Sequence, residues 1–124
     1  MTVQEVADRL VELLRVSDYE TIYKELFSPE IVSAEPEGAP WGEVKGFDAL
    51  AKKGKEFGEM VESFISSEIS DPIVADDFIS LSMKSVLKWK GATEPTNADE
   101  ICVYTVKDGK IVREEFFYTP QPQS

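Results

Sequence analysis

Three glutamates lie inside or at the end of apolar stretches, where a carboxylate can meet a bound molecule as well as solvent. Glu35 ends "IVSAE", Glu100 begins "EICVYTV", and Glu114 lies within "KIVREEFFY". A carboxylate in apolar surroundings loses hydration and is repelled by a second carboxylate nearby, so its pKa rises toward neutrality. Such groups can exchange protons near neutral pH, which general acid and base catalysis requires.

The other residue types limit what these carboxylates could do. The chain has no histidine, which excludes histidine-based acid and base catalysis, histidine-activated nucleophiles and most catalytic zinc sites. Its one cysteine, Cys102, cannot form an internal disulfide, and we expect an inert apolar side chain there. Glutamates without histidine and without close spacing do not indicate a metal site, so we expect neither a metal nor another cofactor.

Charge and hydropathy limit the partners. A net charge of −11 in 124 residues repels phosphate backbones and anionic lipid surfaces, so we expect no nucleic-acid and no membrane partner. No apolar run approaches the roughly 20 residues of a membrane span, and "MTVQEVADRL" lacks the pattern of a signal peptide. With a single cysteine, the cytoplasm is the expected location.

Helical periodicity dominates the first half of the chain. Apolar residues recur at helical spacing in 3–14, 19–27 and 47–61, and a short strand is expected at 31–36. Capping boxes predict the start of the first two helices, and they are formed by Thr2 with Glu5 and by Ser17 with Glu20.

Strand alternation dominates the second half. From Phe64 the period changes to two and predicts strands at 64–74 and 77–89, then a hairpin within 100–120 that turns at 107–110. This order predicts an α+β fold in which three N-terminal helices pack on a strongly curved, mostly antiparallel sheet and enclose a cone with an open mouth. We expect residues 1–119 to form one domain and 120–124 to be a frayed tail.

The element order resembles the nuclear-transport-factor-2-like superfamily, which has a cystatin-like fold, and within it the SnoaL-like group. The resemblance covers nearly the whole chain and rests on "LFSPEIVSAEP", "VKGFDAL" and, most specifically, "VYTVKDGKIVREEFFY". The superfamily includes isomerases, polyketide cyclases, dehydratases, epoxide hydrolases and proteins that only bind a ligand. The resemblance therefore implies a small-molecule pocket without fixing an activity.

Ketosteroid isomerases of this fold provide a more detailed comparison. They carry their base carboxylate directly before a proline on the first strand, and Glu35-Pro36 matches that position. Their two oxyanion donors, a tyrosine and a second acid, correspond here to Val11 and Cys102. The resemblance implies a retained base, but not an isomerase of that type.

The strand register of the family implies which side chains face the pocket. On the last two strands these are Glu100, Cys102, Tyr104, Val112, Glu114, Phe116 and Tyr118. Glu115 then faces away, with Arg113 and Phe117. The catalytic candidates are accordingly Glu35, Glu114 and Tyr104. The residues expected to contact the ligand are Trp41, Met83, Trp89, Glu100, Cys102, Phe116 and Tyr118.

Two functions remain open at this point, so the sequence does not decide whether the protein is an enzyme. One is a non-catalytic protein that binds a small apolar or aromatic molecule, which the missing oxyanion donors favour. The other is a proton-transfer enzyme of isomerase, cyclase or dehydratase type acting on a carbonyl-bearing molecule, which the inward carboxylates favour. Glu100 and Glu114 could also be structural partners of a lysine or arginine.

We also expect a homodimer that forms through the outer face of the sheet. Phe78, Val86 and Phe117 fall on this face among polar neighbours, which is more apolar surface than a lone sheet face should expose.

Overall fold

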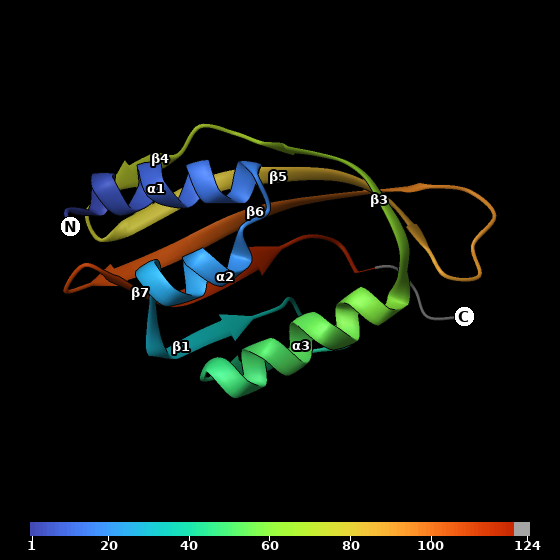
Figure 1. The fold of residues 1–124 in the computed structure, drawn as a ribbon, viewed down its shortest axis with the longest axis horizontal. Helices are drawn as coiled ribbons and strands as arrows, with labels where there is room; N and C mark the ends of the chain where they lie inside the picture. Colours follow the sequence, from blue (N-terminus) through green and yellow to red (C-terminus); the bar gives the residue numbers. More distant parts are fainter. Residues whose placement is uncertain (121–124) are drawn as a thin grey trace.

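The computed structural model describes residues 1–120, which form an α+β fold (Figure 1). Its helical segments are α1 (Val3–Arg15), α2 (Tyr19–Thr21), the π-helical turn η1 (Ile22–Leu26) and α3 (Phe47–Met60). Its strands are β1 (Phe27–Ala34), β2 (Glu43–Lys45), β3 (Val61–Ile69), β4 (Ile73–Ala75), β5 (Phe78–Trp89), β6 (Thr96–Lys107) and β7 (Lys110–Phe117). The expected tail lies, apart from Pro120, outside the described residues. None of the helices described is long and apolar enough to cross a membrane.

The strands form one sheet in the order β2-β1-β7-β6-β5-β3, with β4 paired to β5. The antiparallel meander of β3, β5, β6 and β7 matches the four predicted strands, and β1 joins β7 in parallel, so the sheet is mixed. Asp71 and Pro72 separate β3 from β4, since proline lacks the amide that a ladder needs. Asp108 and Gly109 have φ values of 52° and 77°, as a tight hairpin turn requires.

The helices differ from the three regular N-terminal helices that periodicity predicts. α1 begins as predicted, with reciprocal hydrogen bonds between Thr2 and Glu5. The second helix is only a three-residue α-helix followed by a π-helical turn, and its cap is Asp18 rather than Ser17. Phe27 already belongs to β1, because its ring is buried there, and α3 follows two strands.

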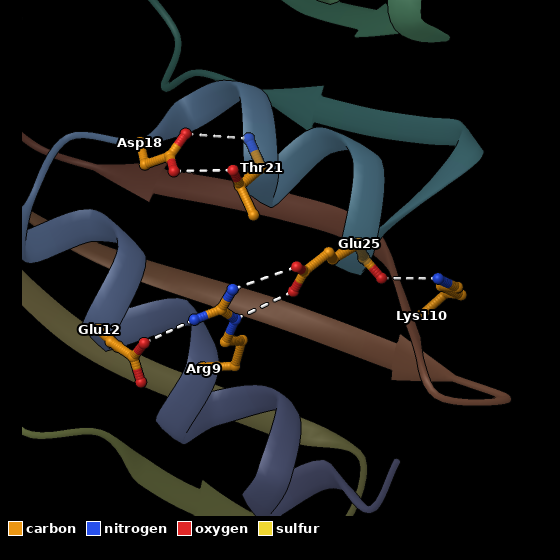
Figure 2. A network of polar contacts seen from close by, with 6 residues as sticks. All are labelled: Arg9, Glu12, Asp18, Thr21, Glu25 and Lys110. Atoms are coloured by element: carbon orange, nitrogen blue, oxygen red, sulfur yellow. Dashed lines mark hydrogen bonds and ion pairs between the residues drawn. The ribbon is translucent and has the colours of Figure 1, made fainter.

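Polar contacts attach the short helical segment to its neighbours (Figure 2). Arg9 on α1 donates to both carboxylate oxygens of Glu25, at 2.9 and 3.1 Å. Lys110 at the start of β7 donates to the Glu25 carbonyl at 2.6 Å. Asp18 accepts hydrogen bonds from the amide and hydroxyl of Thr21. These contacts fix η1 between α1 and β7.

The helices cover one face of the sheet, which we call the inner face (Figure 1). The apolar stripe of α1 is buried against it and consists of Val6, Ala7, Leu10, Val11, Leu13 and Leu14. These residues share one core cluster with inward side chains of β5, β6 and β7, including Ile79, Tyr104 and Ile111. The core is therefore concentrated beneath α1.

A β-bulge in β7 decides which of its side chains face inward. Ile111 pairs with Val106, whereas the next paired residue is Arg113, so Val112 is an extra residue in the strand. Ile111 is completely buried, and Val112 is only partly buried. The inward prediction for Val112 is wrong, because the bulge shifts the alternation and the inward register resumes at Glu114.

Candidate functional site

Adjacent strands place four buried side chains in one row across the inner face, and these are Ser33, Glu114, Tyr104 and Ile79. Their exposed fractions are 1, 7, 2 and 0%. Because neighbouring residues of a strand point to opposite faces, Glu115 lies on the outer face. Glu114 is thus the inward member of the adjacent glutamate pair, as the alternation predicts.

The next two rows are more open to solvent. Phe116 faces Cys102 in one row, and Glu100 faces Met83 in the following row, near Tyr118 at the end of β7. Cys102 is fully buried, whereas the other four side chains are partly exposed. The inner face therefore opens toward Glu100 and Tyr118, away from the core beneath α1.

A hydrogen-bonded chain links Glu114 to α3. Ser33 Oγ donates to Glu114 Oε1 at 2.8 Å, and Lys53 Nζ donates to Ser33 Oγ at 2.9 Å. The same ammonium lies 3.4 Å from Glu35 Oε1 and 5.1 Å from the centroid of the Phe116 ring. Buried charges need partners, and Lys53 supplies one that Glu35 and Glu114 share.

Glu35 keeps one oxygen free inside the protein. Its side chain is 10% exposed, and its Oε1 forms the ion pair with Lys53. Its Oε2 is buried and has no hydrogen-bond partner among residues 1–120. A buried carboxylate oxygen costs free energy when it lacks a donor. Glu35 Oε2 is therefore a buried acceptor without a donor in the described residues.

Glu100 has a weaker partner. The Cys102 thiol donates to Glu100 Oε1 with an Sγ–Oε1 distance of 3.7 Å, and a thiol is a weak donor. Burial, and next the charge of Glu35, raise the pKa of Glu100 to about 7. Burial also raises the pKa of Cys102, so its sulfur is a neutral thiol.

The pKa of the Glu114 carboxyl is shifted in the same direction. Burial raises its pKa to about 7, against the lowering effects of the Ser33 hydrogen bond and the Lys53 charge. Burial also raises the pKa of Glu35, and Lys53 opposes this shift. Glu100 and Glu114 are therefore close to half-protonated near neutral pH, where acid and base catalysis operates.

Aromatic side chains continue the inner surface toward α3. The Phe57 ring makes edge contacts with Trp41 and Trp89, at centroid distances of 6.1 and 5.8 Å. The Trp41 indole donates to Glu56 Oε2 at 2.9 Å, which holds the loop 35–42 against α3. Phe64, also next to Phe57, is largely exposed. This end of the inner face offers apolar surface to a ligand.

The predicted site residues fall into two groups. Tyr104 and Cys102 belong to the buried core, a position that does not favour their expected contact with a ligand. Glu114 is buried in the row next to the two open rows. The partly exposed candidates around the open end are Glu35, Trp41, Met83, Trp89, Glu100, Phe116 and Tyr118.

Lys53 and Ser33 are parts of the cluster that the sequence analysis does not single out. Ser33 lies two residues before Glu35 and so shares its face of the strand. Lys53 follows Leu50 by three residues and precedes Phe57 by four, which places a lysine on the apolar stripe of α3. A polar residue at each of these inward positions is the signal that could have revealed them.

Two hollows in the described surface lie away from Glu35 and Glu114. One, of about 480 Å³, is lined by the N-terminus and the β6–β7 turn. The other, of about 160 Å³, is lined mainly by outward residues such as Ile101 and Phe117, and also by Glu100. The candidate site is therefore defined by its partly exposed inner side chains and not by either hollow.

The raised pKa of Glu114 predicts how stability depends on pH. Between its ordinary value of 4.5 and about 7, the folded state holds this proton more tightly than the unfolded state, so stability falls as pH rises. This difference in pKa corresponds to about 3 kcal/mol. We predict that Glu114→Gln removes about half of the decline in the free energy of unfolding between about pH 5 and about pH 8, measured by urea denaturation, because Glu100, with a pKa also raised to about 7, accounts for a similar share.

Glu115→Gln is the matched control, because it removes the same charge from the outer face of the same strand. This variant should keep the decline of the wild-type protein. Equal flattening in both variants, or a wild-type protein that becomes more stable across this range, would contradict the assignment to Glu114.

Comparisons with known proteins identify the family to which this arrangement belongs. A family model for the SnoaL-like domain matches residues 1–118. A search of curated proteins found no match. Among solved structures, a Mesorhizobium loti protein, named as a SnoaL-like polyketide cyclase and, in brackets, a carbohydrate phosphatase, is 30% identical with a TM-score of 0.87. The alignment covers 95% of this chain and 100% of that one.

Two further solved structures share the fold at lower identity. A nuclear-transport-factor-2-like protein from Burkholderia thailandensis is 18% identical, with a TM-score of 0.81 and coverage of 94% of this chain and 90% of that one. TerC, co-crystallised with polyporic acid, is 17% identical, with a TM-score of 0.77 and coverage of 94% and 91%. The match over residues 1–118 confirms the resemblance seen in the sequence, and the chain belongs to the SnoaL-like domain family, with a nuclear-transport-factor-2-like fold.

Proposed function

We propose that this protein binds a small molecule at the open end of its inner face. The molecule has an apolar body that packs on the aromatic and methionine side chains, and a polar group that turns toward Glu35 and Glu100. The observation that carries the proposal is the buried Glu35 oxygen without a partner in residues 1–120, at the border of a partly exposed apolar wall. A ligand that donates a hydrogen bond there removes the cost of this unpaired oxygen.

The surroundings of this oxygen support the same use. Phe116, Met83 and Trp89 face inward and are only partly covered by the chain itself. Pockets that bind small molecules combine such apolar walls with a few polar groups. TerC, which shares the fold, was crystallised with the small molecule polyporic acid.

A thermal-shift screen with hydroxylated aromatic ketones and polyketide-like compounds, whose hydroxyl groups can donate to Glu35, tests the proposal. A ligand at about ten times its Kd adds about 1.4 kcal/mol to the stability of the folded state, so binders raise the melting temperature. We expect amide chemical-shift changes for each hit to concentrate in residues 100–104 and 114–118. The matched variants are Phe116→Leu and Phe117→Leu, which shorten neighbouring aromatic residues on opposite faces.

Phe116→Leu should weaken the hits, and Phe117→Leu should not. Hits that map to the outer face, or that lose equal affinity in both variants, would contradict binding at the inner site.

A second candidate function is proton transfer on a carbonyl-bearing molecule. It is favoured by the free oxygen of Glu35 together with the two carboxyls whose pKa values lie at about 7. In this proposal Glu35 is the base, and the donor is Tyr118 rather than the buried Tyr104. Burial raises the pKa of Tyr118 to about 12, so its hydroxyl remains protonated and can donate to a developing oxyanion.

Deuterium exchange at the α-carbon of a bound aromatic ketone, followed by proton NMR in D₂O, tests this candidate. We expect the protein to accelerate the exchange and Glu35→Gln to slow it about 100-fold or more, since general bases contribute factors of this size. Glu37→Gln makes the same change at an exposed position nearby and should leave the rate unaltered. If ketones bind but their deuterium exchange is no faster than in buffer, the proposal of catalysis fails and the proposal of binding stands.

We also propose a homodimer through the outer face of the sheet. Phe78, Ile101 and Phe117 are about half exposed on this face, and Ile101 lies directly opposite Phe117 on the neighbouring strand. Lysines and acidic residues alternate around them, and Lys84 pairs in register with Asp99. A surface with both charges around an apolar centre is complementary to a second copy of itself.

Light scattering at micromolar concentration tests the dimer. We expect twice the mass of one chain for the wild-type protein and the mass of one chain for Phe117→Lys, because the contact loses an aromatic ring and burying an ammonium is costly even near an acidic residue. Val16→Lys, at an exposed position after α1, should remain dimeric. A wild-type protein that stays monomeric across a range of salt would overturn the proposal.

A further inference from the structure

We propose that the ligand of the inner site carries a protonated amine beside its apolar body, and that Glu35 and Glu100 bind this amine between them. The inference rests on the proposed binding function, because it names the class of molecule that the same site takes.

The cluster holds more carboxylates than cations. Glu35, Glu100 and Glu114 share the space with Lys53. The ammonium of Lys53 already donates to Ser33 and pairs with Glu35 Oε1. Once Glu100 and Glu114 are ionised, above neutral pH, a positively charged group would therefore find an excess of negative charge, whereas a negatively charged group would be repelled.

The free acceptors at the open end favour a group with several donors. Glu35 Oε2 has no partner in the described region, and the hydrogen bond recorded for Glu100 comes from the weak thiol donor of Cys102. Glu35 lies two residues beyond Ser33, the partner of Glu114, and Glu100 lies two residues before Cys102, the partner of Phe116, so both carboxyls lie on the same open side of the Glu114 row. An ammonium offers three donors and no acceptor, so it can serve both carboxylates, whereas a hydroxyl offers one donor.

The walls of the site fit the rest of such a molecule. Phe116 and Tyr118 on one side and Met83 on the other are partly exposed next to Glu100. The ring of Phe116 already contacts one ammonium, that of Lys53, so aromatic surface in this site is compatible with a cation. An aromatic or aliphatic amine can thus bury its body while its charge stays at the carboxylates.

Three probes of similar size and different charge test the inference, namely benzylamine, benzyl alcohol and benzoate. Binding is measured by amide NMR titration at about pH 8, where Glu100 is mostly ionised, and at about 0.15 M salt, which screens the general attraction of an acidic surface for cations. We expect benzylamine to bind at least about tenfold more tightly than benzyl alcohol, with shifts in residues 100–104 and 114–118, and benzoate not to bind.

Matched variants identify the carboxylate responsible. Glu35→Gln should weaken benzylamine about tenfold and benzyl alcohol by a smaller factor, because the alcohol loses a hydrogen bond but no ion pair, whereas Glu37→Gln should change neither. Glu100→Gln provides a second test at the other carboxylate if Glu35→Gln does not fold, and it should weaken benzylamine in the same direction.

The outcomes separate this inference from the function on which it rests. If benzyl alcohol or benzoate binds at the inner site as tightly as benzylamine, the inference of an amine ligand is overturned. The proposal of small-molecule binding then remains. Benzylamine whose shifts lie on the outer face, or whose affinity survives both Glu35→Gln and Glu100→Gln, would also overturn it. If neither these probes nor the wider ketone screen gives a ligand, both the inference and the proposed function fail.

Discussion

Burial of the Lys53 ammonium holds the inner site together. Through Ser33 it reaches Glu114 on β7, and it pairs directly with Glu35 beyond the end of β1. Of the 14 residues of α3, the helix buries only Leu50 and Lys53, so its position over this end of the sheet depends strongly on that polar contact. Loss of one partner from a buried charged group typically costs about 3–5 kcal/mol, because the remaining charge has nothing to neutralise it. The cluster thus stabilises the arrangement and also confines several carboxylates in one place.

The two ends of the inner face are built on different interactions. Beneath α1, apolar side chains fill the space completely, and Tyr104 and Cys102 belong to that core. Toward α3, the chain covers the sheet incompletely, and polar groups take the place of apolar packing. The candidate site lies at this boundary, where burial raises the pKa of Glu100 to about 7 while the Glu100 and Tyr118 side chains remain partly exposed.

The sequence predicts those features that depend on local periodicity. The meander, the turn at 107–110 and the inward direction of Glu114 follow from period-two alternation, and the capping box of α1 follows from two residues. Two other features depend on contacts between distant segments. Phe27 joins β1 because it is buried by the sheet, and Val112 bulges out of the register. Local alternation contains no information about either.

The candidate site shows the same contrast between features that follow from local patterns and features that depend on contacts between distant segments. The strand parity of the family register brings Glu100 and Glu114 to the inner face, and both lie there. The partnership of Lys53 with Ser33 and Glu35 joins residues that are 20 and 18 positions apart and needs the packing of α3 on β1, which no pattern within one element reveals. Tyr104 satisfies the parity rule as well, yet α1 covers it, so parity places a side chain on a face without determining its access to solvent.

The most direct test of this account is a pH titration of the glutamate side-chain carboxyl carbons by ¹³C NMR, with the Glu114 resonance assigned from Glu114→Gln. If Glu114 is buried as described, its resonance should titrate with a pKa of about 7, because burial outweighs the lowering effects of Ser33 and Lys53, and it should remain apart from those of exposed glutamates. Titration at its ordinary value of 4.5 would contradict the dominant effect of burial on this carboxyl.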